Sequence, residues 1–153
     1  MDSFEDPVSL AWWVHHHFQF PGPPANFAVV VVEFPITVDL MDWPQDLSGV
    51  LVRGEGITSI GVNRKHSRGR RHFTLWHEFF HYLVHHHQWH FKCSLPEQRR
   101  QERDCDIFAA HVLMPEEWVL GLQGPLWVAA RRLEVSVQAL SRRLDELGLR
   151  GNP

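Results

Sequence analysis

The sequence predicts an α+β fold, in which a small sheet of about three strands packs on a metal-binding helix and a helical subdomain forms the C-terminus. Three observations predict it. Short runs rich in β-branched and apolar residues lie between residues 36 and 62, as in strands. The next segment has apolar residues at helical spacing and contains His77-Glu78-Phe79-Phe80-His81, an HExxH motif. Beyond it, amphipathic stretches separated by Pro and Gly are typical of helices.

The chain has 153 residues, the length of one ordinary domain, and its 44% apolar and 22% charged residues are those of a globular protein. We therefore expect a single domain over residues 1–153. Within it, residues 7–62 form an N-terminal helix and the sheet, and residues 68–115 form the metal-binding helices. Residues 116–148 form C-terminal helices that resemble a helix-turn-helix.

Composition excludes several classes of protein. A formal net charge of −3 gives no global electrostatic basis for binding nucleic acid. No apolar run approaches the ~20 residues of a membrane span, and the acidic N-terminus is unlike a secretory signal. Two cysteines, Cys93 and Cys105, are too few for a disulfide framework, which favours free thiols in a reducing compartment. We expect a cytoplasmic protein.

The N-terminal part begins with apolar residues at helical spacing, which predict a helix over residues 7–18. The run Pro21-Gly22-Pro23-Pro24 ends it. Residues 25–33 contain four consecutive valines, which on propensity alone favour a buried strand. A short helix begun by Pro23-Pro24 is the alternative, and the sequence leaves the two open.

Three short strands are predicted next, over residues 36–40, 49–53 and 57–62. A turn at Gly54-Glu55-Gly56 joins the last two. We place the last strand at an edge of the sheet.

The HExxH helix is predicted over residues 70–87, with an apolar stripe that includes Phe73, Trp76 and Phe80. A capping box, Ser94 with Glu97 three residues on, starts a long helix that ends near Met114, before Pro115.

Short helices over residues 115–122 and 124–133 follow. Ser136 caps a last helix that runs to Leu147 and is closed by Gly148. The stretch from residue 128 to residue 144 resembles a helix-turn-helix. Asp145 and Glu146 weaken a basic reading surface, so we favour a structural role for this segment over direct DNA binding.

The HExxH motif carries the chemistry. His77 and His81 are four residues apart, so on a helix their imidazoles lie on one face and can hold one metal ion. Glu78 lies about 100° round the helix and could reach a metal-bound water. Two His ligands, a third carboxylate ligand and an open fourth position form a catalytic zinc arrangement. Alone, the motif is only moderately specific.

The following helix supplies a second pair at the same spacing, Glu102 and Asp106. Zinc peptidases with an HExxH motif use such a pair: the Glu completes the ligand set, and the acid one turn later accepts the second ring N–H of a metal-bound His. We expect Glu102 to be the third ligand, with Asp106 supporting a histidine. The rivals are Glu97, which the capping box already explains, and Asp104, which lies on another face.

With these residues in place, the segment from Asn63 to Pro115 resembles the ImmA/IrrE family of metallopeptidases. That family has a strand ending in Val-Asn, an Arg-x-x-Phe-Thr-Leu-x-His-Glu-x-x-His helix and a Glu-x-x-Ala-Asn/Asp-x-Phe-Ala-x-x-Leu-Leu-Met-Pro helix. The matching runs here are Val62-Asn63, Arg70-Arg71-His72-Phe73-Thr74-Leu75-Trp76-His77-Glu78-Phe79-Phe80-His81 and Glu102-Arg103-Asp104-Cys105-Asp106-Ile107-Phe108-Ala109-Ala110-His111-Val112-Leu113-Met114-Pro115.

Four residues depart from the family pattern. Phe80 stands where the family usually has Gly and Trp76 where it has Ala, so the packing beside the metal helix must be bulkier. Cys105 replaces a small Ala, and Val112 replaces Leu. None of these changes removes a ligand.

The resemblance implies a zinc-dependent endopeptidase, with manganese as the alternative ion, in which His77, His81 and Glu102 hold the metal and Glu78 is the base. It further implies a protein substrate, a helix-turn-helix transcriptional repressor whose cleavage switches on stress or mobile-element genes. The substrate would add as an antiparallel strand along residues 57–62, as in gluzincin-like peptidases. Two alternatives are a DNA-binding module with structural zinc and a domain that binds the repressor without cutting. The intact Glu78 argues against both.

Other candidates have simpler explanations. Tyr82 is a weaker candidate for an oxyanion donor, because it points about 100° away from His81. Cys93 is a rival ligand, although a free thiol is the simpler account. We interpret two groups of histidines as solvated helix faces or as cations near a helix C-terminus. The first group is His15, His16 and His17, and the second is His85, His86, His87 and His90.

Overall fold

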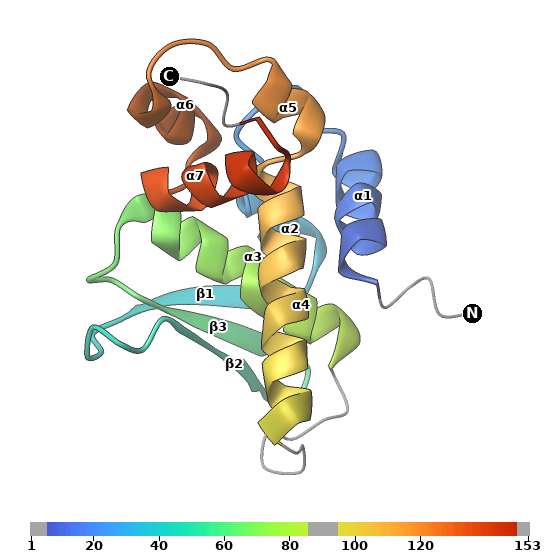
Figure 1. Ribbon diagram of the computed structural model, residues 1–153. Coiled ribbons are helices and arrows are strands. Elements are labelled where there is room, and N and C mark those ends of the chain that lie inside the picture. Colours follow the sequence, from blue (N-terminus) through green and yellow to red (C-terminus); the bar gives the residue numbers. More distant parts are fainter. Residues whose placement is uncertain (1–5, 86–94, 150–153) are drawn as a thin grey trace.

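The computed structural model describes residues 6–85 and 95–149. It confirms the α+β class: a three-stranded sheet lies under one helix, α3, and α4 crosses α3 on its other side (Figure 1). No helix in these two ranges is both long enough and apolar enough to cross a membrane. The elements in order are α1 (Pro7–Phe18), α2 (Ala28–Glu33), β1 (Ile36–Met41), β2 (Gly49–Arg53), β3 (Thr58–Asn63), α3 (Arg68–Val84), α4 (Leu95–Leu113), α5 (Glu116–Leu120), α6 (Leu126–Leu133) and α7 (Val137–Glu146).

The sheet has the order β1-β3-β2. β1 pairs with β3 in parallel, and β2 pairs with β3 in the antiparallel direction, so that Gly49 lies opposite Val62. The expectation that residues 57–62 form an edge strand is therefore wrong. The turn at residues 54–57 makes β2 and β3 a hairpin, and β1 occupies the other side of β3. In the described part of the chain β2 pairs with β3 alone, which leaves its outer edge unpaired.

The valine run forms a helix, which settles the question that the sequence left open. In α2 only Val30 is fully buried, whereas Val32 is 86% exposed. The Asn26 side chain accepts a hydrogen bond from the backbone N–H of Ala28 at 2.9 Å, and the Val30 N–H donates to the Phe27 carbonyl at 2.9 Å. Local hydrogen bonding and one-sided burial thus outweigh the strand propensity of valine.

The apolar side of α3 forms the centre of the core. Trp76 and Phe80, the two bulky departures from the family pattern, are completely buried. The Trp76 indole N–H donates to the carbonyl of Ala25 at 3.0 Å, and the Phe80 ring lies 5.1 Å from the ring of Phe108 on α4. The expected bulkier packing beside the metal helix is therefore present.

α3 starts two residues earlier than expected. Ser67 is its N-cap and accepts a hydrogen bond from the backbone N–H of Arg70. The helix ends at Val84, and His85 is its C-cap. The expected continuation to residue 87 and the capping residue Ser94 lie outside the described residues.

The C-terminal helices pack directly on α3 and α4. Gly69 lies so close to the α6–α7 turn that a Cβ there would sit 2.6 Å from the carbonyl carbon of Val135. Ser136 caps α7 as expected, accepting from the Ala139 N–H at 3.0 Å. The buried Arg143 donates from Nε to the carbonyl of Met114 at the end of α4, at 2.9 Å. These contacts support a structural role for the segment.

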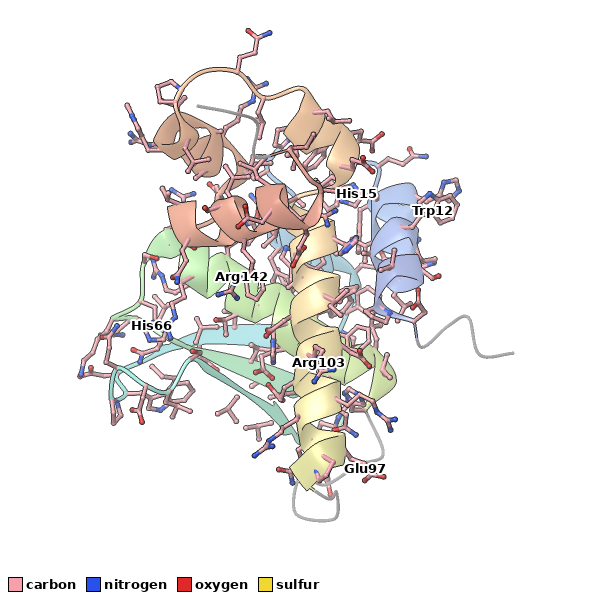
Figure 2. The ribbon with its side chains drawn as sticks, in the orientation of Figure 1. Trp12, His15, His66, Glu97, Arg103 and Arg142 are labelled. Atoms are coloured by element: carbon pink, nitrogen blue, oxygen red, sulfur yellow. The ribbon has the colours of Figure 1, made fainter. Side chains whose placement is uncertain are left out.

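The histidines of α1 do not converge. His15 points inward, with Nε2 2.7 Å from the carbonyl oxygen of Val112, whereas Trp12 points away from the molecule (Figure 2). The His16 ring stacks on Trp12. These rings are therefore occupied with packing and a backbone contact.

Candidate metal centre

Two imidazoles of α3 meet one carboxylate of α4. The Nε2 atom of His77 lies 2.9 Å from Oε2 of Glu102, and the Nε2 atom of His81 lies 2.8 Å from Oε1 of the same side chain. Because the histidines are four residues apart on a helix, their rings face the same side. The structure thus brings together the three side chains that the sequence indicates as ligands.

Asp106 holds the other nitrogen of His77. Its Oδ1 accepts a hydrogen bond from Nδ1 at 2.8 Å, which turns Nε2 toward Glu102. Burial lowers the pKa of His77, but the hydrogen bonds to Asp106 and Glu102 outweigh it and raise the pKa to about 10. Hydrogen bonds from His77 and His81 hold the pKa of Glu102 well below its usual range. In this arrangement a cation, whether a proton or a metal ion, is strongly favoured between these groups.

Glu78 lies between α3 and the edge strand. It is only 8% exposed, and Gly49 at the start of β2 approaches it closely. A Cβ at Gly49 would lie 3.3 Å from Oε1 of Glu78 and 2.4 Å from Cγ2 of Thr74. Glycine is therefore needed for the edge strand to pass this close to the HExxH helix.

Asn63 positions that strand, a role that sequence reasoning did not assign. It is fully buried, and its amide donates to the carbonyls of Pro44 and Leu47, each at 2.8 Å. Its backbone N–H donates to the carbonyl of Ser48. These bonds fix the loop that leads into Gly49. The signal was available in the sequence, because Val62-Asn63 was part of the family resemblance.

Tyr82 lies beside the other end of β2. Its ring stacks on Phe79 at 5.9 Å and meets Phe34 at 6.0 Å. The Arg53 guanidinium lies 5.0 Å over the Tyr82 ring and donates to the backbone carbonyl of Tyr82 at 2.9 Å. These contacts give no support to Tyr82 as an oxyanion donor.

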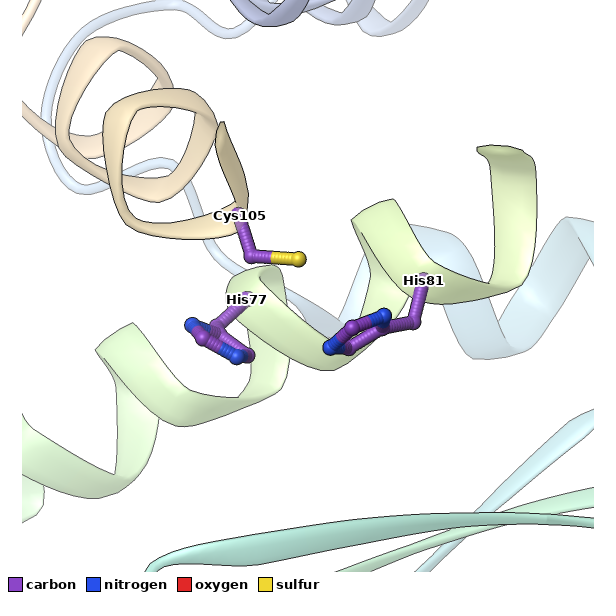
Figure 3. Close-up of side chains that lie close together, drawn as sticks. All are labelled: His77, His81 and Cys105. Atoms are coloured by element: carbon purple, nitrogen blue, oxygen red, sulfur yellow. The ribbon is translucent and has the colours of Figure 1, made fainter. Parts of the chain in front are cut away.

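Cys105 lies beside the two histidines, which sequence reasoning missed. Figure 3 shows its sulfur close to both rings, and Sγ and a ring nitrogen of each histidine all lie within 4.8 Å of one another. The side chain is fully buried. Burial and the nearby carboxylates, first Glu102, raise the pKa of the thiol. Its position three residues after Glu102, on nearly the same helix face, was the signal.

The rival acidic residues lie elsewhere. Glu97 is exposed in the first turn of α4. Asp104 interacts electrostatically with Arg100, Arg103 and Asp6 of the N-terminal segment, and burial raises its pKa. The remaining candidates, Cys93, His86, His87 and His90, lie outside the described residues.

The donor set fits a zinc ion. Imidazole nitrogen and carboxylate oxygen are both ordinary zinc ligands, and a carboxylate on the second ring nitrogen of a ligating histidine is the usual support for such sites.

Residues 27–145 match the model of the peptidase M78 family, described as an IrrE N-terminal-like domain. The chain belongs to this family. The match covers the sheet, α3, α4 and most of the C-terminal helices, and it confirms the resemblance to the ImmA/IrrE metallopeptidases. Membership of a peptidase family implies a protein substrate. No curated protein matches the chain.

Proposed function

We propose that the protein is a zinc-dependent endopeptidase, with manganese as an alternative ion, in which His77, His81 and Glu102 hold the metal and Glu78 is the general base. The observation that carries the proposal is the convergence of the two Nε2 atoms on one carboxylate, at 2.9 and 2.8 Å. Next to it, Glu78 is almost fully buried against the edge strand. A structural metal site would have no use for that second carboxylate.

Each residue has a separate role in the proposed reaction. Asp106 keeps the proton of His77 on Nδ1, so that the Nε2 lone pair is available to a metal. When bound, zinc lowers the pKa of a water and polarises a substrate carbonyl. Glu78 accepts a proton from the attacking water at a carboxylate oxygen and returns it to the leaving amine nitrogen. Its burial beside Gly49 holds it at the place where the substrate backbone passes.

The edge of β2 is the substrate-binding strand in this proposal. An extended peptide can pair with an unpaired strand edge through backbone hydrogen bonds. β2 runs from Gly49, beside Glu78, to Arg53, whose guanidinium donates to the backbone at Tyr82 near the end of α3. A peptide along this edge would therefore pass the whole length of the HExxH turn. The outward side chains Val50 and Val52 are exposed and available to it.

The substrate we propose is a helix-turn-helix transcriptional repressor in the cytoplasm, whose cleavage switches on stress or mobile-element genes. Support for this identity comes from the ImmA/IrrE resemblance over Asn63–Pro115. The geometry supports a narrower statement, cleavage of an extended segment of a protein.

The test is Glu78→Gln. The variant should keep one zinc ion per chain, because Glu78 is not a ligand, and should lose cleavage of a cognate repressor, because an amide does not accept the water's proton. Zinc content, thermal unfolding and repressor binding are measured beside cleavage, with the conservative variant Glu97→Gln on exposed α4 surface as the matched control. If Glu78→Gln relieves repression in a reporter assay as well as the parent does, proteolysis is not the mechanism.

One observation favours a second candidate function. Cys105 lies close enough to His77 and His81 to become a metal ligand. A thiolate added to His77, His81 and Glu102 would fill the fourth position, and a closed site of this kind is structural. The protein would then be a domain that binds its repressor, or DNA, without cutting. The spectrum of the cobalt-loaded protein, described in the Discussion, separates the two candidates.

A further inference from the structure

A cavity of about 390 Å³ adjoins the metal centre. It lies between α3, α4 and α7, and Asp106, which holds His77, forms part of its wall. A shallower hollow lined by Glu102, Arg103 and Asp106 shares two of these residues with the cavity. The cavity and this hollow therefore meet at Arg103 and Asp106, next to the proposed ligand Glu102. Its volume is within the roughly 300–1,000 Å³ of small-ligand sites.

The rim of the cavity is basic. Arg70 comes from α3, Arg103 from α4 and Arg142 from α7, and the last two project on the side of the molecule that faces the viewer (Figure 2). No ion pair joins Arg103 or Arg142 to an acidic residue in the described part of the chain. Arg70 only donates to the hydroxyl of Ser48, at 3.3 Å.

The two acidic residues in the wall are already engaged. Asp106 accepts from His77, and Glu146 lies 3.6 Å from the guanidinium of Arg143. The histidine of the wall, His111, has a pKa lowered by burial, so it adds no positive charge at neutral pH. Among the described residues, the three guanidinium groups around this opening therefore form no ion pair with a carboxylate, and Arg103 interacts with Asp104 only through a longer-range electrostatic contact.

Part of the cavity lining is apolar and forms the floor of the proposed site. It consists of Phe73 of α3, Ile107 and Ala110 of α4, Met114 directly after α4, and Ala139 of α7. A ligand that fits must present hydrocarbon to this floor and a negative group to the arginines. A long aliphatic cation such as lysine would meet three like charges on entry.

We infer that this cavity is the specificity pocket of the peptidase, and that it takes a glutamate side chain next to the scissile bond. The inference rests on the proposed function, and it adds the class of residue recognised. The glutamate methylenes would cover the apolar floor, and its carboxylate would receive charge-assisted hydrogen bonds from Arg103 and Arg142. Glutamine has the same shape without the charge, which makes it the matched comparison.

Binding is tested first, without any need for cleavage. The chain has three methionines, Met1, Met41 and Met114, so methyl labelling of methionine gives few signals. In the zinc-loaded Glu78→Gln variant, N-acetyl-glutamate amide should shift the Met114 methyl resonance in the cavity and leave that of Met41, on β1, unchanged. N-acetyl-glutamine amide should bind roughly tenfold more weakly, since it lacks the charged hydrogen bonds.

Charge reversal supplies the matched controls. Arg142→Glu should abolish the glutamate-induced shift, whereas Arg132→Glu, the same change at an exposed position of α6, should leave it intact. If glutamate and glutamine probes behave alike, or if Arg142→Glu changes nothing, the pocket does not read a carboxylate and the inference is wrong.

Cleavage specificity is tested second. The zinc-loaded protein is incubated with a peptide pool derived from a whole proteome, and the new termini are sequenced. Glutamate should be enriched at one position directly flanking the cut, and Arg142→Glu should remove that enrichment. If the cuts show no preference for glutamate, the inference is wrong but the proposed peptidase activity is supported. The same holds if the position of the cuts depends on a free C-terminal carboxylate of the peptide instead of a glutamate side chain. If no peptide is cut but the Met114 resonance still shifts specifically with the glutamate probe, the proposed peptidase function is wrong and the glutamate pocket is supported.

Discussion

Two groups of histidines, His15, His16 and His17 on α1 and His77 with His81 on α3, lie in different environments. His15 lies against a backbone carbonyl, and burial lowers its pKa. His77 lies between two carboxylates, which raise its pKa to about 10. Both rings are largely buried, so burial does not distinguish them. On α1 a carboxylate contacts a single ring, as Glu33 does with His17. On α3 one carboxylate, Glu102, contacts two imidazoles at once, and this convergence distinguishes the two groups.

The difference teaches how a metal site can be told from a cluster of histidines. A cluster offers ligands, but a site also balances the charge of the ion and orients each ring. Glu102 supplies the balancing negative charge beside His77 and His81. Asp106 orients the ring of His77 through its hydrogen bond to Nδ1.

The largest effect expected from this comparison is the loss of the metal. His81→Ala should remove the stoichiometric zinc ion completely, because one ligand and half of the contact with Glu102 disappear. The triple variant His15→Gln, His16→Gln, His17→Gln should retain it. Metal analysis after dialysis against a weak chelator checks both. A tightly bound ion in His81→Ala would move the site to other histidines or to a cysteine.

A smaller effect is expected when the ligands stay and only the orientation is lost. Asp106→Asn keeps an acceptor oxygen near Nδ1 of His77 but removes its charge, so zinc affinity or activity should fall by about 10–100-fold. Zinc affinity is measured by competition with a chelating dye. A loss as complete as that in Glu102→Gln would show that Asp106 is itself a ligand.

Much of this site could be predicted from the sequence because its geometry is local. A spacing of four residues on a helix places His77 with His81, and Glu102 with Asp106, whatever the rest of the fold does. The capped ends of α7 and the three strand segments also follow from local patterns. Whether residues 28–33 form a helix or a strand could not be predicted in this way, because the burial of one valine out of four depends on which distant residues pack against them.

The other features that the sequence did not predict depend on contacts between distant segments. Which strand lies at the edge depends on β1 pairing beside β3. The cavity beside Asp106 depends on α7 packing against α3 and α4, which Gly69 permits by its close approach to Val135. In the sequence Cys105 stands out only as a replacement for a small Ala, and only the crossing of α4 over α3 shows its sulfur beside the histidines.

Cys105 therefore provides the next test, with a smaller expected effect on the metal. If Glu102 is the third ligand, the cobalt-loaded protein should show no thiolate-to-cobalt charge-transfer band. Cys105→Ala should then keep one ion per chain and lose only about 1 kcal/mol of stability through the missing buried sulfur. A band that Cys105→Ala removes and Cys93→Ala retains would instead support the closed, non-cutting site.

The smallest effect concerns the α1 side of the comparison. In the unfolded chain His15 titrates near its ordinary pKa of 6.5, whereas burial holds it neutral to lower pH in the folded protein. Between these two values the unfolded state binds more protons, so the free energy of unfolding falls as the pH drops through 6.5. His15→Gln removes this contribution, while its amide can still donate to the carbonyl of Val112.

We therefore expect the loss of stability between about pH 7.5 and about pH 5.5 to be smaller in His15→Gln than in the parent. Urea unfolding with a chelator present throughout measures it without a contribution from metal release. His15→Gln should remove only part of the pH dependence, because burial also lowers the pKa of His72 and His111.

His77 contributes to the pH dependence with the opposite sign. Its raised pKa stabilises the metal-free fold below pH 6.5, and this stabilisation is lost as the pH rises toward about 10. An unchanged pH dependence in His15→Gln would mean that the two groups of histidines do not differ in the way their surroundings indicate.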